Sequence, residues 1–311
     1  MYSFVYQVYF WLKRREKKRK EEGKNPSKAR VFLLGYVEWF YNVPVRRWYE
    51  KHPSNKYGLN RKPREQKVIV SFTSYPKRIG DVWLVAETLL RQSCKPDKVI
   101  LWLADSQFPG GLADLPPRLT ALQERGLTIR FCDDLRSHKK YYYAMQEYPQ
   151  DLIILADDDI FYPRDTVKKL MQMHEQWPDD ICCMTAQVIE PDFCAAPSLW
   201  RNPKLSEMNL QHTDRIQVFT GSGSLFPPGS LPKEAFDQEQ IRSLCLHADD
   251  LWTTFMAHGK GTKITTMRKW RPFPVMIYGT AVDSLYYINA EEGQNDVQWQ
   301  NLLEHFGADR P

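Results

Sequence analysis

Residues 152–160, LIILADDDI, decide the fold: an apolar run stops at three consecutive aspartates, Asp157, Asp158 and Asp159. The apolar run has the length and composition of a strand buried on both faces. Three adjacent carboxylates raise one another's pKa, and a nearby cation is the usual way to relieve the repulsion. An acidic turn that caps the following helix would need only one aspartate. The stretch therefore predicts a ligand site at a strand end, where open α/β sheets bind their ligands.

The spacing of the aspartates indicates which of them could share a ligand. Because strand side chains alternate between faces, we expect Asp157 and Asp159 to point the same way and Asp158 to point away. Carboxylate oxygens are the ligands that hard divalent cations prefer. The sequence thus predicts a metal site made by Asp157 and Asp159.

Strand and helix patterns alternate on both sides of this stretch. Before it, we expect strands at 68–72, 98–104 and 127–131 and helices at 81–92, 118–125 and 139–148. After it, we expect helices at 164–177, 249–258 and 297–306 and strands at 181–189 and 215–219. Strands separated by helices of this size imply parallel pairing with right-handed crossovers. The predicted fold class is α/β, with a mixed, mostly parallel sheet flanked by helices.

Residues 1–65 form a separate block, which we expect to be a helical extension. Residues 2–12 and 31–41 are apolar and aromatic, and residues 13–30 carry ten Lys or Arg and three Glu, a net charge of +7. Aromatic rings beside cations are what an interfacial membrane anchor requires, so residues 1–41 predict binding to an anionic membrane surface. The alternative is a pair of helices packed on the body with a solvated basic loop between them. We expect Asn42 and Pro44 to end the second helix.

Charge and cysteine content restrict the function further. The whole chain carries a net charge of +5, so the body outside residues 13–30 is close to neutral, which argues against a nucleic-acid partner. The six cysteines form no C-x-x-C pair, which predicts free thiols, no zinc site and a reducing compartment. Residues 2–12 are too short to span a bilayer. These features favour a cytoplasmic protein that is peripheral on the inner face of the plasma membrane.

Five segments occur in an order that resembles a known family: SFTSYPKRI (71–79), KVILWLA (98–104), ILADDDIFYP (154–163), GSGSLFPP (221–228) and ADDLW (248–252). Together, over roughly residues 67–306, they resemble bacterial glycosyltransferases of the GT-A fold, close to the family 2 group. The resemblance implies a Rossmann-like GT-A domain at 66–311, with a nucleotide-sugar-binding half at 66–163 and an acceptor-binding half at 164–311. It also implies that the aspartates form a D-x-D motif that binds Mn²⁺ or Mg²⁺ on the diphosphate of the nucleotide sugar. Asp159 would be the main metal ligand, and Asp157 would reach the ribose or the metal through water.

Further donor-site candidates follow the predicted strands at the same sheet edge: Thr73, Tyr75, Arg78, Asp105, Asp133, Lys140 and Asp158. By the resemblance, Thr73 and Tyr75 lie where the family holds the nucleotide base. Arg78 and Lys140 are cations that could contact phosphate, although surface solvation also explains them. Asp105 and Asp133 could accept a hydrogen bond from the base, or could simply end their strands in a turn.

Two motifs in the second half concern the acceptor. The resemblance implies that Gly221, Ser222 and Gly223 form a loop below the donor sugar and the acceptor, although a tight turn would also explain the glycines. It further implies that Asp250, at the start of a helix, deprotonates the acceptor hydroxyl, with Asp249 orienting it. Pure helix capping is the alternative and would need one aspartate. The D-D-G-S signature of the second strand is absent, and so is the Q-x-x-R-W signature of processive synthases.

The motifs together predict an inverting, metal-dependent glycosyltransferase. It would move a single sugar from a nucleotide-diphosphate sugar to a hydroxyl of a cell-surface glycan or lipid-linked acceptor. A metal-dependent nucleotidyltransferase or phosphohydrolase also uses aspartates at strand ends and stays open as an alternative. A membrane-associated, glycan-binding scaffold without activity is the second alternative.

Overall fold

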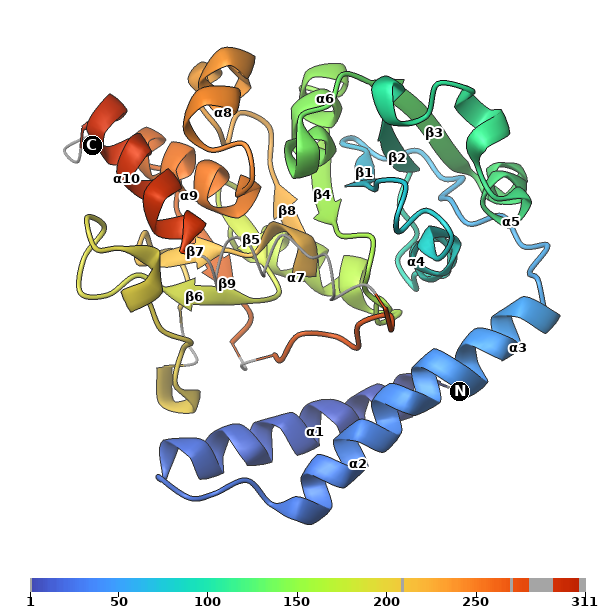
Figure 1. The fold of residues 1–311 in the computed structure, drawn as a ribbon, viewed down its shortest axis with the longest axis horizontal. Coiled ribbons are helices and arrows are strands. Elements are labelled where there is room, and N and C mark those ends of the chain that lie inside the picture. The colour runs from blue at the N-terminus through green and yellow to red at the C-terminus, as the bar shows by residue number, and fades with distance from the viewer. Residues whose placement is uncertain (1, 208–209, 269–270, 280–292, 308–311) are drawn as a thin grey trace.

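The computed structural model describes residues 2–207, 210–268, 271–279 and 293–307, and its centre is a mixed seven-stranded sheet (Figure 1). Four parallel strands form one side in the order β3-β2-β1-β4: Leu127–Cys132, Lys98–Ala104, Val68–Thr73 and Leu152–Ala156. Beside β4, β8 (Ser224–Phe226) runs antiparallel to β4 and to β5 (Ile181–Cys183), and β9 (Ile264–Thr266) runs parallel to β5. The predicted fold class, a mixed and mostly parallel sheet, is confirmed.

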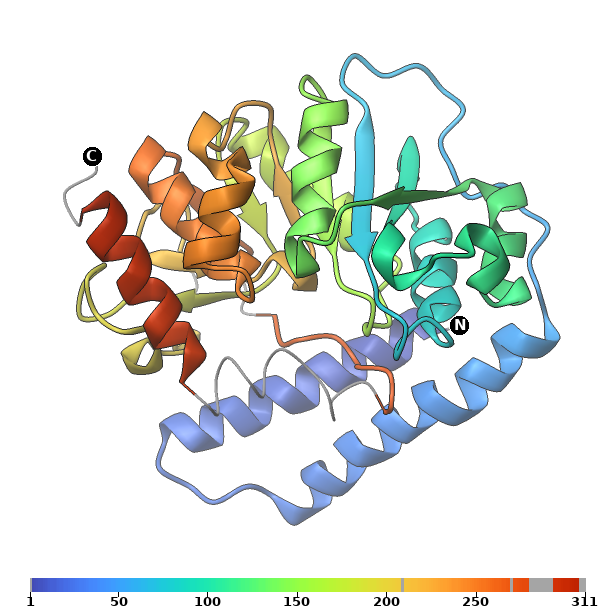
Figure 2. The ribbon, with the colours of Figure 1, turned by 45° about the horizontal axis from the view of Figure 1, so that its top comes forward.

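Helices cover both faces of the sheet because the strands are apolar on both faces. In β1, Val68, Val70 and Phe72 belong to one hydrophobic core, whereas Ile69 belongs to the other. The helices of the body are α4 (Val82–Leu90), α5 (Pro117–Thr120), α6 (Lys139–Glu147), α7 (Thr166–Gln176), α8 (Gln238–Leu244), α9 (Asp249–Lys260) and α10 (Gln294–Phe306). The strand alternation thus produces a three-layer body, as Figures 1 and 2 show.

Three features of the body, two of them in its second half, differ from the sequence-based expectation. The expected strand 181–189 is divided: β5 lies in the main sheet, whereas β6 (Ala186–Val188) pairs with β7 (Ile216–Val218) in a separate sheet. The chain leaves the main sheet between them, where the Met184 N–H donates to the Gly223 carbonyl at 3.0 Å. The expected helix 118–125 is α5 followed by a 3₁₀ segment, Ala121–Arg125. The strands β8 and β9 and the helix α8 were not anticipated, because such short elements carry little periodicity.

The N-terminal extension is helical, as predicted, but its second helix does not end where expected. Helices α1 (Tyr2–Glu21) and α2 (Lys28–Phe40) form an antiparallel hairpin, and α2 continues through a π-helical turn, Tyr41–Val45, into α3 (Arg46–Lys51). Pro44 lies inside this turn, whose wider hydrogen-bonding pattern accommodates a residue without an N–H. The Asn42 side chain is buried and bonds the Met276 carbonyl at 2.9 Å and the Tyr278 N–H at 2.7 Å. Asn42 therefore ties the extension to the body instead of ending the helix.

The inner side of the hairpin packs on the body. The Tyr6 hydroxyl donates to the Phe161 carbonyl, and the Tyr41 ring lies 5.6 Å from the Phe161 ring. The Arg271 guanidinium lies 4.7 Å from the centre of the Phe10 ring. Among the described residues, no helix is both long and apolar enough to cross a membrane.

Candidate functional site

The three aspartates lie where β4 ends, at the carboxyl edge of the sheet. β4 stops at Ala156, so Asp158 and Asp159 lie in a turn and do not follow the alternation of a strand. Asp158 accepts hydrogen bonds from the Ser74 hydroxyl at 2.5 Å and from the Arg78 guanidinium at 2.7 Å. Asp159 accepts from the same guanidinium nitrogen at 3.0 Å. Arg78 therefore neutralises part of the acidic cluster, from the loop that follows β1.

Asp157 has a different partner, which links it to the second acidic pair. The Lys140 ammonium, on α6, lies 2.7 Å from an Asp157 carboxylate oxygen and 3.0 Å from one of Asp249. The Lys140 side chain is only 2 % exposed, whereas that of Asp157 is 39 % exposed. Burial alone would lower the pKa of Lys140, but the surrounding aspartates outweigh it and raise that pKa. Lys140 is thus a buried cation between two predicted site carboxylates, with its head group turned toward them and away from solvent.

Asp249 and Asp250 begin α9 and face Thr220. The N-cap of α9 is Ala248 and makes no side-chain capping bond, so pure helix capping does not explain either aspartate. The Thr220 N–H donates to Asp250 at 2.8 Å, and its hydroxyl lies within hydrogen-bonding distance of both carboxylates. Thr220 directly precedes the glycine-containing loop. The two motifs of the second half therefore form one cluster with Lys140.

The two carboxylates of this pair have opposite protonation tendencies. Burial, with the nearby charges of Asp249 and Asp157, raises the pKa of Asp250 to about 7. Burial also favours the neutral form of Asp249, but the charge of Lys140 and the hydrogen bond from Thr220, with other neighbours, together outweigh it and lower the pKa of Asp249 to about 2. Divergent values in neighbouring carboxylates are typical of acid–base pairs in enzymes. At neutral pH the pair can accept one proton, on Asp250.

Gly221 is required by a close approach of the backbone to Asp157. A Cβ built on Gly221 would lie 1.5 Å from an Asp157 carboxylate oxygen, so any side chain would displace that carboxylate. The Asp157 N–H also donates to the Gly221 carbonyl at 3.2 Å. Ser222 bonds Thr185, and Gly223 has a φ of +105°, which favours glycine. The loop and the preceding Thr220 thus contact both Asp157, at the end of β4, and the aspartates at the start of α9.

The remaining donor-site candidates lie along the same edge of the sheet. The Thr73 hydroxyl, at the end of β1, donates to the Trp102 carbonyl at 2.8 Å. The Tyr75 ring lies under the Arg78 guanidinium, 5.6 Å from it. Asp105 and Asp133 directly follow β2 and β3 and are both exposed. In the strand order β3-β2-β1-β4, the triplet follows β4 and Arg78 lies in the loop after the adjacent strand β1. Asp105 and Asp133 follow β2 and β3 and so lie further from the triplet.

The residues present are compatible with a divalent cation only in part. Among the residues described, no cluster of three or more His, Cys, Asp or Glu could hold a metal on its own. Burial and the charges of Asp157 and Asp158 raise the pKa of Asp159 to about 7, so these carboxylates repel one another despite Arg78. Mg²⁺ and related ions are commonly held by one or two carboxylates, with substrate phosphates completing the shell. Asp157 and Asp159 fit that kind of site.

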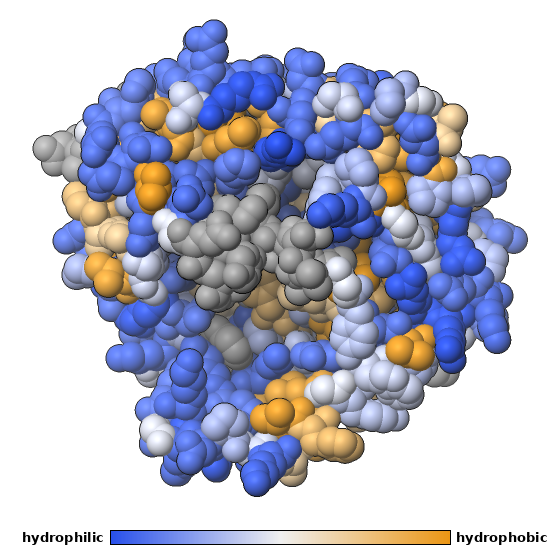
Figure 3. Space-filling model, viewed as in Figure 1, coloured by the Kyte–Doolittle hydropathy of each residue, from blue (hydrophilic) through white to orange (hydrophobic). Residues whose placement is uncertain are grey.

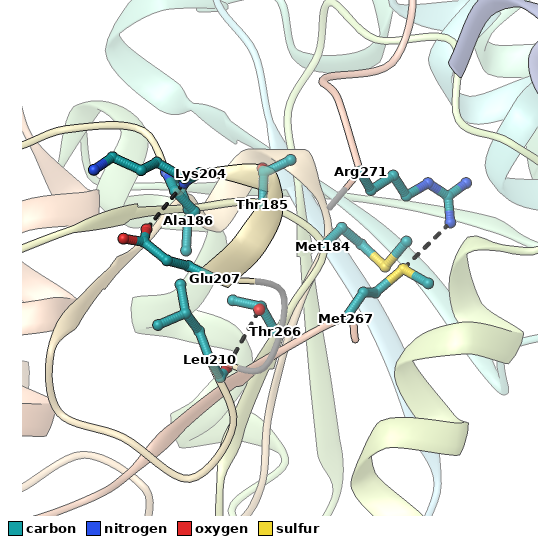
Figure 4. A pocket seen from close by; sticks show the side chains of 10 residues that line it. Met184, Thr185, Ala186, Lys204, Glu207, Leu210, Thr266, Met267 and Arg271 are labelled. Atoms are coloured by element: carbon teal, nitrogen blue, oxygen red, sulfur yellow. Dashed lines mark hydrogen bonds between the residues drawn. The ribbon is translucent and has the colours of Figure 1, made fainter. Parts of the chain in front are cut away.

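A hollow lies beside the glycine-containing loop, and Figure 4 shows the side chains that line it. It is lined by Met184, Thr185, Ala186, Pro203, Lys204, Glu207, Leu210, Thr266, Met267 and Arg271. It adjoins the loop because Met184 bonds Gly223 and Thr185 bonds Ser222. Arg271, buried and paired with Asp165 at 3.1 Å, connects the hollow to the N-terminal hairpin through Phe10.

Sequence reasoning missed three residues that hold the site together. Ser74 fixes Asp158, Thr220 joins Asp249 to Asp250, and the Tyr162 hydroxyl bonds both the Gly221 carbonyl and the Asp157 N–H, the latter at 2.7 Å. Ser74 and Thr220 adjoin predicted motifs, which is a signal that could have found them. No local pattern links Tyr162 to Gly221, 59 residues away.

No protein-family model and no curated protein matches the chain. Among solved structures, the chain is similar to the mannosyltransferase PcManGT from Pyrobaculum calidifontis in complex with GDP-Man and Mn²⁺: 14 % identity, TM-score 0.48, covering 84 % of this chain and 70 % of that one. It is similar to 4-diphosphocytidyl-2C-methyl-D-erythritol synthase (12 %, TM-score 0.42, 70 % and 96 %). It is also similar to residues 1–349 of TarS from S. aureus (13 %, TM-score 0.42, 79 % and 73 %). These likenesses are distant, and no residue of this chain takes a role from them.

Proposed function

We propose that this chain is a glycosyltransferase that moves one sugar from a nucleotide-diphosphate sugar to an acceptor hydroxyl, with inversion at the anomeric carbon. The observation that carries the proposal is the meeting of two acidic motifs across Lys140. One motif, at the end of β4, is suited to a cation and a diphosphate; the other, at the start of α9, contains a carboxylate with a pKa of about 7. An in-line displacement needs these two functions side by side.

In the proposed reaction, the Asp250 carboxylate takes the proton from the acceptor hydroxyl. The acceptor oxygen forms a bond to the anomeric carbon, and the bond from that carbon to the diphosphate oxygen breaks, so the diphosphate leaves with the electron pair. Arg78 is proposed to contact the departing diphosphate, because its guanidinium, from the loop after β1, lies beside Asp159. Asp157 and Asp159 would hold Mn²⁺ or Mg²⁺, which supplies a positive charge for the leaving group when bound.

The remaining residues orient these groups. Lys140 holds Asp157 and Asp249 at fixed positions, and Thr220 holds Asp250. None of the three carboxylates therefore needs to reorganise during the reaction. Asp105, Asp133, Thr73 and Tyr75 are proposed to contact the nucleoside, from the strand ends beyond Arg78. The loop at Gly221–Gly223 and the hollow behind it are proposed as the acceptor side, for a glycan or lipid-linked acceptor.

The proposal is tested by incubating the protein with a panel of nucleotide sugars and Mn²⁺, and following release of the nucleoside diphosphate. Slow hydrolysis of one donor, lost in Asp159→Asn, is the expected result. Release of a nucleoside monophosphate and a sugar 1-phosphate would instead indicate a phosphohydrolase. Release of pyrophosphate from nucleoside triphosphates added to the panel would indicate a nucleotidyltransferase. Absence of both turnover and nucleotide binding would indicate the non-catalytic scaffold.

A further inference from the structure

The outer side of the N-terminal hairpin exposes large apolar side chains on both of its helices. On α1, Phe4 and Trp11 are 75 % and 52 % exposed. On α2, five apolar side chains are between 43 % and 75 % exposed: Val31, Phe32, Leu33, Tyr36 and Trp39. Figure 3 shows apolar surface along the lower edge of the molecule, where α1 and α2 lie in the same view. We call these seven residues the aromatic face.

The aromatic face lies on the side of the hairpin turned away from the body. The inward positions of the same helices, among them Tyr6, Leu12, Leu34 and Val37, are buried in the core. The hairpin therefore packs on the body, as the second alternative expects, and also presents an aromatic surface to the outside. Contiguous exposed patches of large apolar residues mark interaction sites in soluble chains.

Cations border the aromatic face. Arg15 and Lys18 continue the outward stripe of α1 beyond Trp11. Lys20, in the last turn of α1, and Lys28, at the start of α2, are also exposed. Residues 13–30 keep a net charge of +7 even though their glutamates pair with Lys17, Lys18, Lys24 and Arg30. A second copy of this chain docking here would bring two such clusters together, which electrostatics disfavours. An anionic bilayer offers both a region for aromatic rings and neutralising charge.

We infer that the aromatic face and its basic border dock on an anionic bilayer surface. The docking would also orient the site. The carboxyl ends of β1 and β4 point toward the side of the molecule that carries α1 and α2 (Figures 1 and 2). Phe161, two residues after Asp159, contacts Tyr6 and Tyr41 of the hairpin. A bilayer on the outer side of the hairpin therefore lies on the same side of the molecule as the candidate site.

The experiment measures sedimentation of the full chain with vesicles of phosphatidylcholine, with and without phosphatidylglycerol. It needs no donor or acceptor, so its result does not depend on the proposed sugar transfer. We expect binding only to the anionic vesicles. The triple variant Trp11→Ser, Phe32→Ser and Trp39→Ser should weaken binding by at least about tenfold, because the rings no longer enter the interface. The triple variant Arg15→Gln, Lys18→Gln and Lys20→Gln should weaken it by about fivefold per cation removed.

Matched controls use residues on other surfaces. Leu112→Ser with Leu199→Ser removes exposed apolar side chains of similar exposure, and Lys56→Gln, Arg61→Gln and Lys62→Gln removes three cations from the loop before β1. Both controls should bind as the unchanged protein does, and circular dichroism should show all variants folded. Failure of the unchanged protein to bind anionic vesicles would overturn the inference. So would equal losses in the controls, or a dimer in solution that only the Trp11, Phe32 and Trp39 variant dissociates.

Discussion

Replacing Asp250 by Asn should separate catalysis from stability, because the same burial that makes this carboxylate a base also destabilises the folded chain. Its pKa of about 7 in the folded protein compares with 3.8 for an unperturbed aspartate. A carboxyl whose folded pKa is raised favours folding below its unfolded pKa, and that contribution is lost as the pH rises toward the folded pKa. At 1.36 kcal/mol per pKa unit, the raised pKa of Asp250 costs about 4 kcal/mol of folding free energy at pH 8 and about 2 kcal/mol at pH 5.

The Asp250→Asn variant cannot ionise but keeps an oxygen for the Thr220 N–H. Its free energy of unfolding at pH 8 should therefore exceed that of the unchanged protein by up to about 4 kcal/mol, with a smaller gain at pH 5. Transfer should fall by about 10²–10⁴-fold, the usual contribution of a general base. Denaturant unfolding at both pH values and an assay of nucleoside diphosphate release with acceptor present measure the two effects. Donor binding should be unchanged.

Asp249→Asn is the matched control, because its carboxylate lies in the same cluster but has the opposite shift. The pKa of Asp249 is lowered to about 2, so its ionised form stabilises the fold above pH 4 and this contribution disappears as the pH falls toward 2. Asp249→Asn should lower the free energy of unfolding by about 2 kcal/mol at pH 8. If Asp250→Asn destabilised the protein at pH 8 as Asp249→Asn does, or if it retained full transfer, the reasoning about this pair would be refuted.

Four further predictions follow from the same geometry. The transfer rate should rise about tenfold per pH unit below pH 7 and level off above it, because Asp250 acts when deprotonated; a flat profile between pH 5.5 and 8 would contradict this. Gly221→Ala should abolish transfer by displacing Asp157, whereas Gly35→Ala, where a Cβ meets nothing within 4 Å, should leave transfer unchanged. Lys140→Met should lower the free energy of unfolding by about 3–5 kcal/mol, since it leaves Asp157 and Asp249 without their shared cation, and urea unfolding at pH 8 would show it. Chelation by EDTA should stop donor hydrolysis and added Mn²⁺ should restore it; full activity in EDTA would exclude the metal at Asp157 and Asp159.

The regular half of the fold could be predicted from the sequence because its strands are long, apolar and separated by helices. The expected strands at 68–72, 98–104 and 152–156 match β1, β2 and β4 within one residue. The second half could not be predicted as well. Its strands β5, β8 and β9 are three residues long, and their pairing is set by the neighbouring strands and not by local periodicity. The prediction that the second helix ends at Asn42 and Pro44 was wrong for a related reason. Contacts of Asn42 with the body support a π-helical turn that the helix propensity of Pro44 disfavours.

In the candidate site, too, residues that stand out within a short stretch of sequence could be predicted, whereas contacts between distant segments could not. Asp157, Asp159, Asp249 and Asp250 stand out because consecutive aspartates are costly without a purpose. The role of Lys140 could not be predicted: its position near a strand end suggested a phosphate contact, whereas its ammonium is buried between carboxylates that lie 17 and 109 residues further along the chain. Only the folded chain brings these three elements together.

The central claim is that the acidic corner after β4 binds a nucleoside diphosphate together with a divalent cation. Calorimetric titration of UDP, GDP and CDP into the protein, with and without Mn²⁺, tests it most directly. The account predicts that at least one nucleotide binds, that binding requires Mn²⁺, and that Asp159→Asn abolishes it while Asp250→Asn does not. Failure of all three nucleotides to bind, or binding that neither Mn²⁺ nor Asp159→Asn changes, would contradict it.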